Sequence, residues 1–301
     1  MRRPPAGWVL AVSLLGISFA GPLVRLSNAD PIAIAAWRLG FSLVIVAIAL
    51  TLTGEWREWR SLTPSDAGLA TVSGVALALH FWAWNASIHL TTIAASVTLV
   101  SLQPAFIVGI SAVFLRESPT RRQLLGIAIA MAGALVIALP AWSERVALGP
   151  GALLGNLLAT SAAVTAAAYY SIGRHMRLRY GLWAYVGLAY TVCTVVLVLM
   201  ALLTGVPLTP QPSRELAIFA ALALGPMLLG HTGMNWALKF LPAYVVNLVV
   251  LGEPVGATIL GAIIPGIRQV PSIPTLAGGC VILTGVLLAA SGTVPSRRRA
   301  G

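Results

Sequence analysis

Ten apolar segments of 20 to 25 residues run through the 301-residue chain, separated by short stretches that contain Pro, Gly, Ser and charged residues. About 20 apolar residues are enough for a helix to cross the hydrocarbon core of a bilayer. In that core only helices and closed barrels satisfy their own backbone polar groups. The segments therefore predict an all-α integral membrane protein with ten transmembrane helices, over residues 7–26, 31–53, 66–88, 92–115, 121–140, 149–173, 181–204, 215–238, 242–264 and 271–292.

Charge supports this class and excludes others. Charged residues make up only 9% of the chain, against about 25% in soluble domains. The net charge of +11 comes from arginines in short clusters between apolar segments, which are typical of topology signals. There is no basic face with interleaved aromatic residues, so we predict no nucleic-acid partner.

The sequence offers no catalytic chemistry. It contains no HExxH, GxSxG or Walker motif, and its four histidines are scattered, which argues against an enzyme, an ATP-driven pump, a metal site or a cofactor. Cys193 and Cys280 lie within apolar segments and do not indicate a disulfide framework.

The distribution of basic residues predicts the orientation. If both termini lie in the cytoplasm, fourteen Lys and Arg residues fall in inner loops and tails, and only four fall outside, namely Arg25, Arg145, Arg214 and Arg268. Cytoplasmic loops of membrane proteins carry such an excess. We therefore expect a multi-pass protein with both termini in the cytoplasm.

Two apolar segments share a polar residue followed by proline. Gln103-Pro104 interrupts the segment 92–115, and Glu253-Pro254 interrupts the segment 242–264, 150 positions later. A proline inside a helix removes one amide donor and frees the carbonyl four residues earlier. Polar groups at that depth are tolerated where they face protein or a watery cavity. The pair indicates a central site with Pro104 and Pro254 as hinges, although both prolines can also be packing kinks.

Other matches extend this repetition. Asn85 matches Asn235 at an offset of 150, and Gly126 and Gly133 match Gly278 and Gly285 at an offset of 152. Halves of five segments each, over residues 1–145 and 146–301, begin on opposite sides of the membrane because five is odd. The halves are then inverted repeats, an arrangement that places substrate sites at the repeat interface.

With these features the chain resembles the drug/metabolite transporter superfamily, in particular its ten-helix EamA-type members. The resemblance spans essentially the whole chain and includes a proline in the fourth helix of each half, with Leu115-Arg116-Glu117 closing the first copy. The second copy departs from the pattern, because it ends in Ile263-Ile264-Pro265-Gly266 without a glutamate. Similarity to the bacterial YddG-like branch implies export of amino acids, aromatic ones prominent, across the cell inner membrane.

Arg38 and Glu253 are the charges that lie deep within segments. A charge at the centre of a membrane helix costs about 2.5–3.5 kcal/mol on insertion scales, so each needs a partner or a cavity. At 1.5 Å per residue they lie about 10 Å and 16 Å deep from opposite sides, close to one level. They either form a structural ion pair, or a zwitterionic substrate or a proton competes with that pairing.

The third segment carries a polar stripe that includes Ser73, His80, Trp84 and Ser87 at helical spacing. Trp84 is suited to an apolar substrate side chain, and a neutral His80 to hydrogen bonding with a carboxylate. We add Gln103, Trp37 and Tyr169 as candidate wall residues, with ordinary packing as the alternative for the aromatic ones.

These features together predict a secondary transporter that exports small polar metabolites, amino acids first, by alternating access. A lipid-moving or lipid-processing membrane protein and a non-transporting scaffold are the alternatives. The sequence leaves open the substrate, any proton coupling and the oligomeric state.

Overall fold

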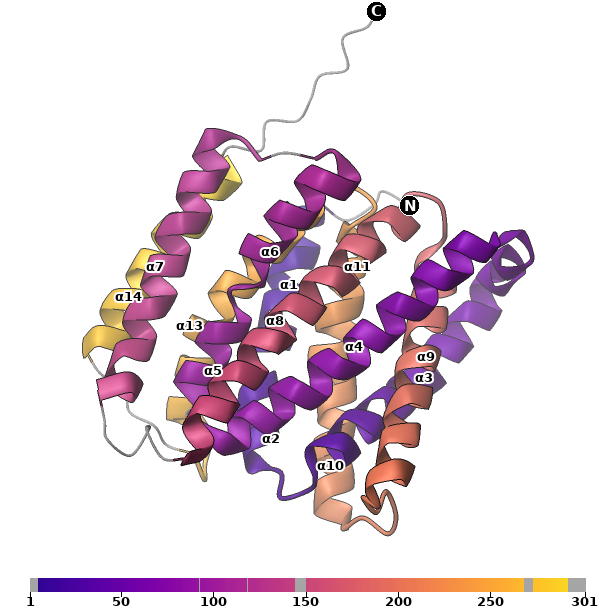
Figure 1. Cartoon of the computed structure of the whole chain (residues 1–301), viewed down its shortest axis with the longest axis horizontal. Helices are drawn as coiled ribbons and strands as arrows, with labels where there is room; N and C mark the ends of the chain where they lie inside the picture. The colour runs from indigo at the N-terminus through magenta and orange to yellow at the C-terminus, as the bar shows by residue number, and fades with distance from the viewer. Residues whose placement is uncertain (1–4, 92, 118, 144–149, 268–272, 292–301) are drawn as a thin grey trace, which may run out of the picture.

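The structure, a computed structural model, describes residues 5–91, 93–117, 119–143, 150–267 and 273–291, and the regular structure in these ranges is helical (Figure 1). Eight spans in them are long and apolar enough to cross a membrane, and a shorter apolar helix covers Leu276–Ala289. An all-α membrane protein is therefore confirmed. Seven of the arginines counted for the orientation lie outside the described residues, at positions 2, 3, 145, 268 and 297–299.

The predicted segments correspond to single or interrupted helices. The first six are α1 (Ala6–Ser18) with α2 (Ala20–Leu26), α3 (Pro31–Thr53), α4 (Pro64–Leu90), α5 (Ile93–Val100) with α6 (Gln103–Ile110) and η2 (Ser111–Leu115), α7 (Arg121–Ser143), and α8 (Pro150–Arg177). The other four are α9 (Leu182–Thr204), α10 (Ser213–Leu222) with η4 (Ala223–Thr232) and α11 (Gly233–Ala237), α12 (Ala243–Asn247) with η5 (Leu248–Gly252) and α13 (Glu253–Ile263), and α14 (Ile273–Ser291). A short 3₁₀ helix, η1 (Glu55–Ser61), follows α3.

The two proline segments are broken, not merely kinked. α5 ends at Val100 and α6 restarts at Gln103, while η5, a 3₁₀ helix, separates α12 from α13. Each proline is the second residue of the new helix. In a first turn the missing proline N–H costs nothing, because the first amides of a helix have no intrahelical partner. The two polar residues therefore stand at the start of new helices.

Two further interruptions, between α1 and α2 and at η4, were not expected from the sequence. η4 is a π-helix with Pro226 inside it, and α1 packs along it. A Cβ atom at Gly16 would lie 2.9 Å from the carbonyl oxygen of Gly225, so the two backbones touch. Proline and π-type hydrogen bonding both disturb a regular helix at such points.

α7 and α14 lie side by side at one edge of the molecule, on the left of Figure 1. A Cβ atom at Gly126 would lie 2.6 Å from the carbonyl oxygen of Gly285, and one at Gly133 would lie 2.7 Å from that of Gly278. Gly126 thus contacts Gly285, the sequence match of Gly133, and Gly133 contacts Gly278, the sequence match of Gly126. This reciprocal contact is the pattern that two-fold related elements make.

Candidate substrate cavity

A small central cavity of about 30 Å³ lies where the interrupted helices approach α3, α4 and α8. This volume is well below the range of about 300–1,000 Å³ that is typical of small-molecule sites, so the lining residues must move apart before a substrate fits. Five of the residues predicted for the site line it, from four different helices and segments far apart in the sequence: Arg38, His80, Trp84, Gln103 and Glu253.

Arg38 is the most unusual group in the cavity. Its side chain is only 1% exposed, and none of its three guanidinium nitrogens has a hydrogen-bond partner. The guanidinium carbon lies 4.1 Å from the centre of the Phe81 ring, a cation–π contact that leaves the planar edge of the group free. A buried charge without a counterion costs several kcal/mol. The three nitrogens of Arg38 are therefore available to donate to an acceptor that enters the cavity.

Arg38 and Glu253 share the cavity but are not joined by a hydrogen-bonded ion pair. Glu253 is the first residue of α13 and is 7% exposed. At a helix N-terminus a carboxylate is favoured by the helix dipole. The two ionisable groups therefore line one cavity without bonding to each other.

Two further polar groups on α4 line this space. The indole Nε1 of Trp84 is buried and has no hydrogen-bond partner, so it is a second unused donor. Nδ1 of His80 lies 2.9 Å from the carbonyl oxygen of Ala162. Because a carbonyl only accepts, Nδ1 carries the proton and Nε2 is left as an acceptor.

Gln103 joins the two broken segments. Its Nε2 donates to Oδ1 of Asn247 on α12 at 2.7 Å, and Asn247 in turn donates to the carbonyl of Ala243 at 2.9 Å. The carbonyl of Val250 accepts from the Glu253 amide and also from the Ser101 hydroxyl, the latter at 3.4 Å. Polar side chains near the interruptions thus bond to one another and to nearby backbone carbonyls.

Two predicted wall residues lie elsewhere. Trp37 donates from Nε1 to the carbonyl of Leu208 at 2.8 Å and packs against Phe41, because successive residues of a helix point about 100° apart and Arg38 takes the cavity face. The hydroxyl of Tyr169 accepts from Asn235 at 2.6 Å, and its ring packs against Tyr170. Tyr169 therefore supports the wall from behind.

Other lining residues were not singled out from the sequence. They include Phe81, Tyr170 and Met234, as well as His231, whose Nδ1 lies 2.8 Å from the Tyr170 hydroxyl. Phe81 and Met234 carry no sequence signal because apolar residues are common in every segment. Tyr170 directly follows Tyr169, and the sequence does not show which of the two tyrosines faces the cavity.

Comparison with known proteins places this architecture. The model of the EamA-like transporter family matches the chain twice, over residues 6–139 and 153–291. The chain belongs to the EamA-like transporter family. It is thus a multi-pass membrane transporter and not an enzyme, and the two EamA matches fall in the two predicted halves.

Two curated relatives are distant but align over nearly their full length. An uncharacterized transporter of Archaeoglobus fulgidus is 26% identical over 286 residues, covering 93% of this chain and 95% of the relative. A probable terminal-alkyne amino-acid exporter of Streptantibioticus cattleyicolor is 26% identical over 304 positions, covering 100% and 98%. A protein of known crystal structure shares the fold with a TM-score of 0.74 at 17% identity, over 95% of this chain and 97% of the other.

Proposed function

We propose that this EamA transporter exports amino acids, aromatic ones among them, across a bacterial inner membrane by alternating access. The observation that carries the proposal is the buried guanidinium of Arg38, whose three nitrogens have no partner. An amino acid carboxylate supplies the acceptors that this group lacks, in the planar geometry that a guanidinium prefers. The name of the Streptantibioticus relative as a probable exporter of an amino acid agrees with this cargo.

The proposed binding pose uses both charges of a zwitterion. The substrate carboxylate lies between the Arg38 guanidinium and the Trp84 indole N–H, and the substrate ammonium lies against the Glu253 carboxylate. The side chain of the substrate then packs against Phe81 and Met234, which also line the cavity. Arg38, Trp84 and Glu253 each gain a partner in this pose, which supplies the specificity.

The proposed architecture has ten helices in two inverted five-helix halves, residues 1–145 and 146–301. The eight spans together with α7 and α14 supply the ten, and the reciprocal glycine contact between α7 and α14 supports the two-fold relation. We place both termini in the cytoplasm, so that Arg116, Arg174 and Lys239 mark the inner face. The excess of basic residues on that side supports this orientation.

Counterflow of labelled amino acids into liposomes containing the purified chain tests the function. We expect saturable flux that is lost in Arg38→Gln and kept in the matched control Lys239→Gln, which removes an exposed charge. Absence of flux for a panel of aromatic, aliphatic and acidic amino acids would contradict the proposal that amino acids are the cargo. Redistribution of a labelled phospholipid in the same liposomes would instead support a lipid-moving protein.

A further inference from the structure

The ends of the helices on the two faces of the molecule carry matching polar contacts. On one face, NH1 of Arg25 at the end of α2 donates to the carbonyl of Ile88 near the end of α4, at 2.9 Å. On the other face, NH1 of Arg174 near the end of α8 donates to the carbonyl of Leu238 after α11, at 2.6 Å. The donors are 149 positions apart and the acceptors 150 positions apart, so each contact is the repeat image of the other.

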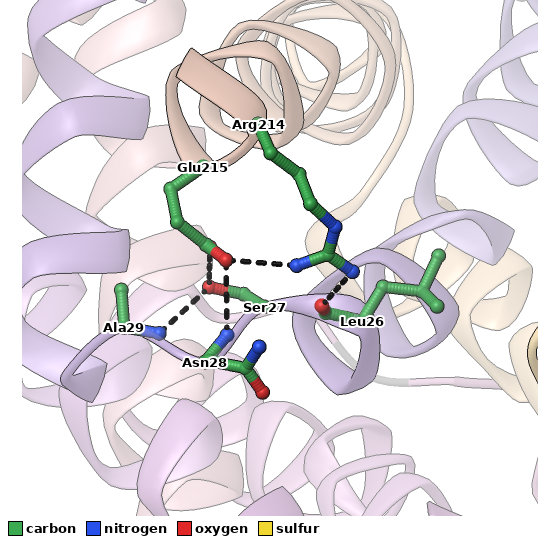
Figure 2. A network of polar contacts seen from close by, with 6 residues as sticks. All are labelled: Leu26, Ser27, Asn28, Ala29, Arg214 and Glu215. Carbon is green, nitrogen blue, oxygen red and sulfur yellow. Dashed lines mark hydrogen bonds and ion pairs between the residues drawn. The ribbon is translucent and has the colours of Figure 1, made fainter. Parts of the chain in front are cut away.

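A second pair of contacts follows the same rule. Glu215 at the start of α10 accepts from Ser27 Oγ at 2.5 Å and from the Asn28 amide at 3.3 Å, in the α2–α3 connection (Figure 2). Its counterpart on the other face is Asp66 at the start of α4, which accepts from Arg179 NH1 at 2.7 Å, in the α8–α9 connection. Both contacts join residues 1–145 to residues 146–301, one on each face.

Some contacts between the halves have no such image: Arg214 with the Leu26 carbonyl on one face, and Glu55 with the Trp183 amide and the Glu117–Arg174 pair on the other. Of these three, the last joins two oppositely charged side chains. Nε and NH2 of Arg174 both donate to Oε1 of Glu117, at 2.9 and 2.8 Å, and this pair also joins the two halves. The pair is largely shielded, with 12% of the Arg174 side chain and 21% of the Glu117 side chain exposed. It fixes the end of η2 to the end of α8 on the inner face.

The opposite face has the arginine but not the acid. At the repeat offsets of 150 to 152, Glu117 corresponds to positions 267–269, which hold Ile267, Arg268 and Gln269. The described part of this segment lies beside the end of α2 as the symmetry requires, because a Cβ atom at Gly266 would lie 3.7 Å from Leu26. Arg25 is exposed there, so nothing acidic in the described segment holds α13 to α2.

We propose that the Glu117–Arg174 pair is a one-sided latch, which biases the empty carrier toward the conformation closed on the inner face. The proposal rests on the alternating-access function given above. In that mechanism the two halves separate on one face at a time, so a contact present on a single face stabilises one of the two states only. A ligand-independent bias of this kind sets how often the inner face opens to collect cargo.

Distances between spin labels on matched exposed positions test the latch without any transport assay. One label pair spans the inner face, at Val113 and Lys239, and its repeat image spans the outer face, at Ile263 and His89. All four positions are exposed. The background carries Cys280→Ala, because Cys280 is exposed whereas Cys193 is buried.

Glu117→Gln should lengthen the inner distance and shorten the outer one, with about a fivefold change in the ratio of the two states, as expected for a partly shielded ion pair. Ile267→Glu places an acid near Arg25 and should shift the distances in the opposite direction, even if Glu117→Gln proves unstable. Unchanged distances in both variants would overturn the latch. A shift in distances without amino acid flux would support the latch and contradict the proposed cargo. Amino acid flux without a shift in distances would support the cargo and contradict the latch.

Discussion

At the scale of single residues, the cavity departs from the rule that buried charges are paired. Arg38 is buried and its guanidinium lies over the Phe81 ring. Its three guanidinium nitrogens have no hydrogen-bond partner. Such a group lowers the stability of the empty protein, and natural proteins keep such groups where they serve binding. The effect of Arg38 on protein stability and its effect on substrate binding can therefore be measured separately.

Arg38→Met should make the empty carrier more stable and abolish amino acid binding. Methionine fills a similar volume and removes the buried charge, so we expect the melting temperature in detergent to rise by a few degrees, in line with about 1–4 kcal/mol for replacing buried ionic groups. Millimolar amino acids should stabilise the wild type but not the variant. A lower melting temperature in Arg38→Met would show that the guanidinium has a structural partner.

Glu253→Gln keeps the shape of the side chain and removes its negative charge. In the proposed pose the variant no longer offers a charged partner to the substrate ammonium. We therefore expect the affinity for zwitterions to fall about 10- to 100-fold, because a charged hydrogen bond is lost. Competition assays with carboxylates that lack an ammonium group provide the control, because their affinity should change much less. Equal losses for both ligand classes would contradict the pose.

At the scale of elements, the positions of the helices could be predicted from apolar length, since a bilayer imposes one length on every span. The breaks at Gln103 and Glu253 were visible because proline cannot continue a helix. The interruption at η4 was missed, although Pro226 lies inside the predicted segment 215–238 and gives the same signal. The placing of Trp37 and Tyr169 behind the cavity depends on tertiary packing, which periodicity alone does not determine.

The contact between α7 and α14 leads to a prediction about packing. Gly133→Val or Gly126→Val places side-chain atoms within 3 Å of the facing backbone, and overpacking of this kind typically costs about 1–3 kcal/mol. We expect lower melting temperatures for both variants in detergent. Gly40→Ala is the matched control, because nothing lies within 4 Å of its added Cβ. Wild-type stability in all three would show that these helices can separate freely.

At the scale of the whole molecule, the proposed orientation predicts which cysteines a membrane-impermeant thiol reagent reaches. Gln211→Cys, in the connection between α9 and α10, should react in intact cells, whereas Arg57→Cys in η1 should react only after permeabilisation. Both positions lie in connections between spans, and the Cys280→Ala background removes the exposed native thiol. Reaction of Arg57→Cys in intact cells would reverse the orientation.

The reciprocal glycine contacts between α7 and α14 also indicate which part of the carrier moves least during transport. Each of the two close approaches is the image of the other, so the two-fold axis of the proposed repeat passes midway between them. Atoms near a rotation axis travel least when the halves tilt, whichever face is opening. The crossing of α7 and α14 would then act as the fulcrum of the carrier, which explains why backbone meets backbone there with no side chain between.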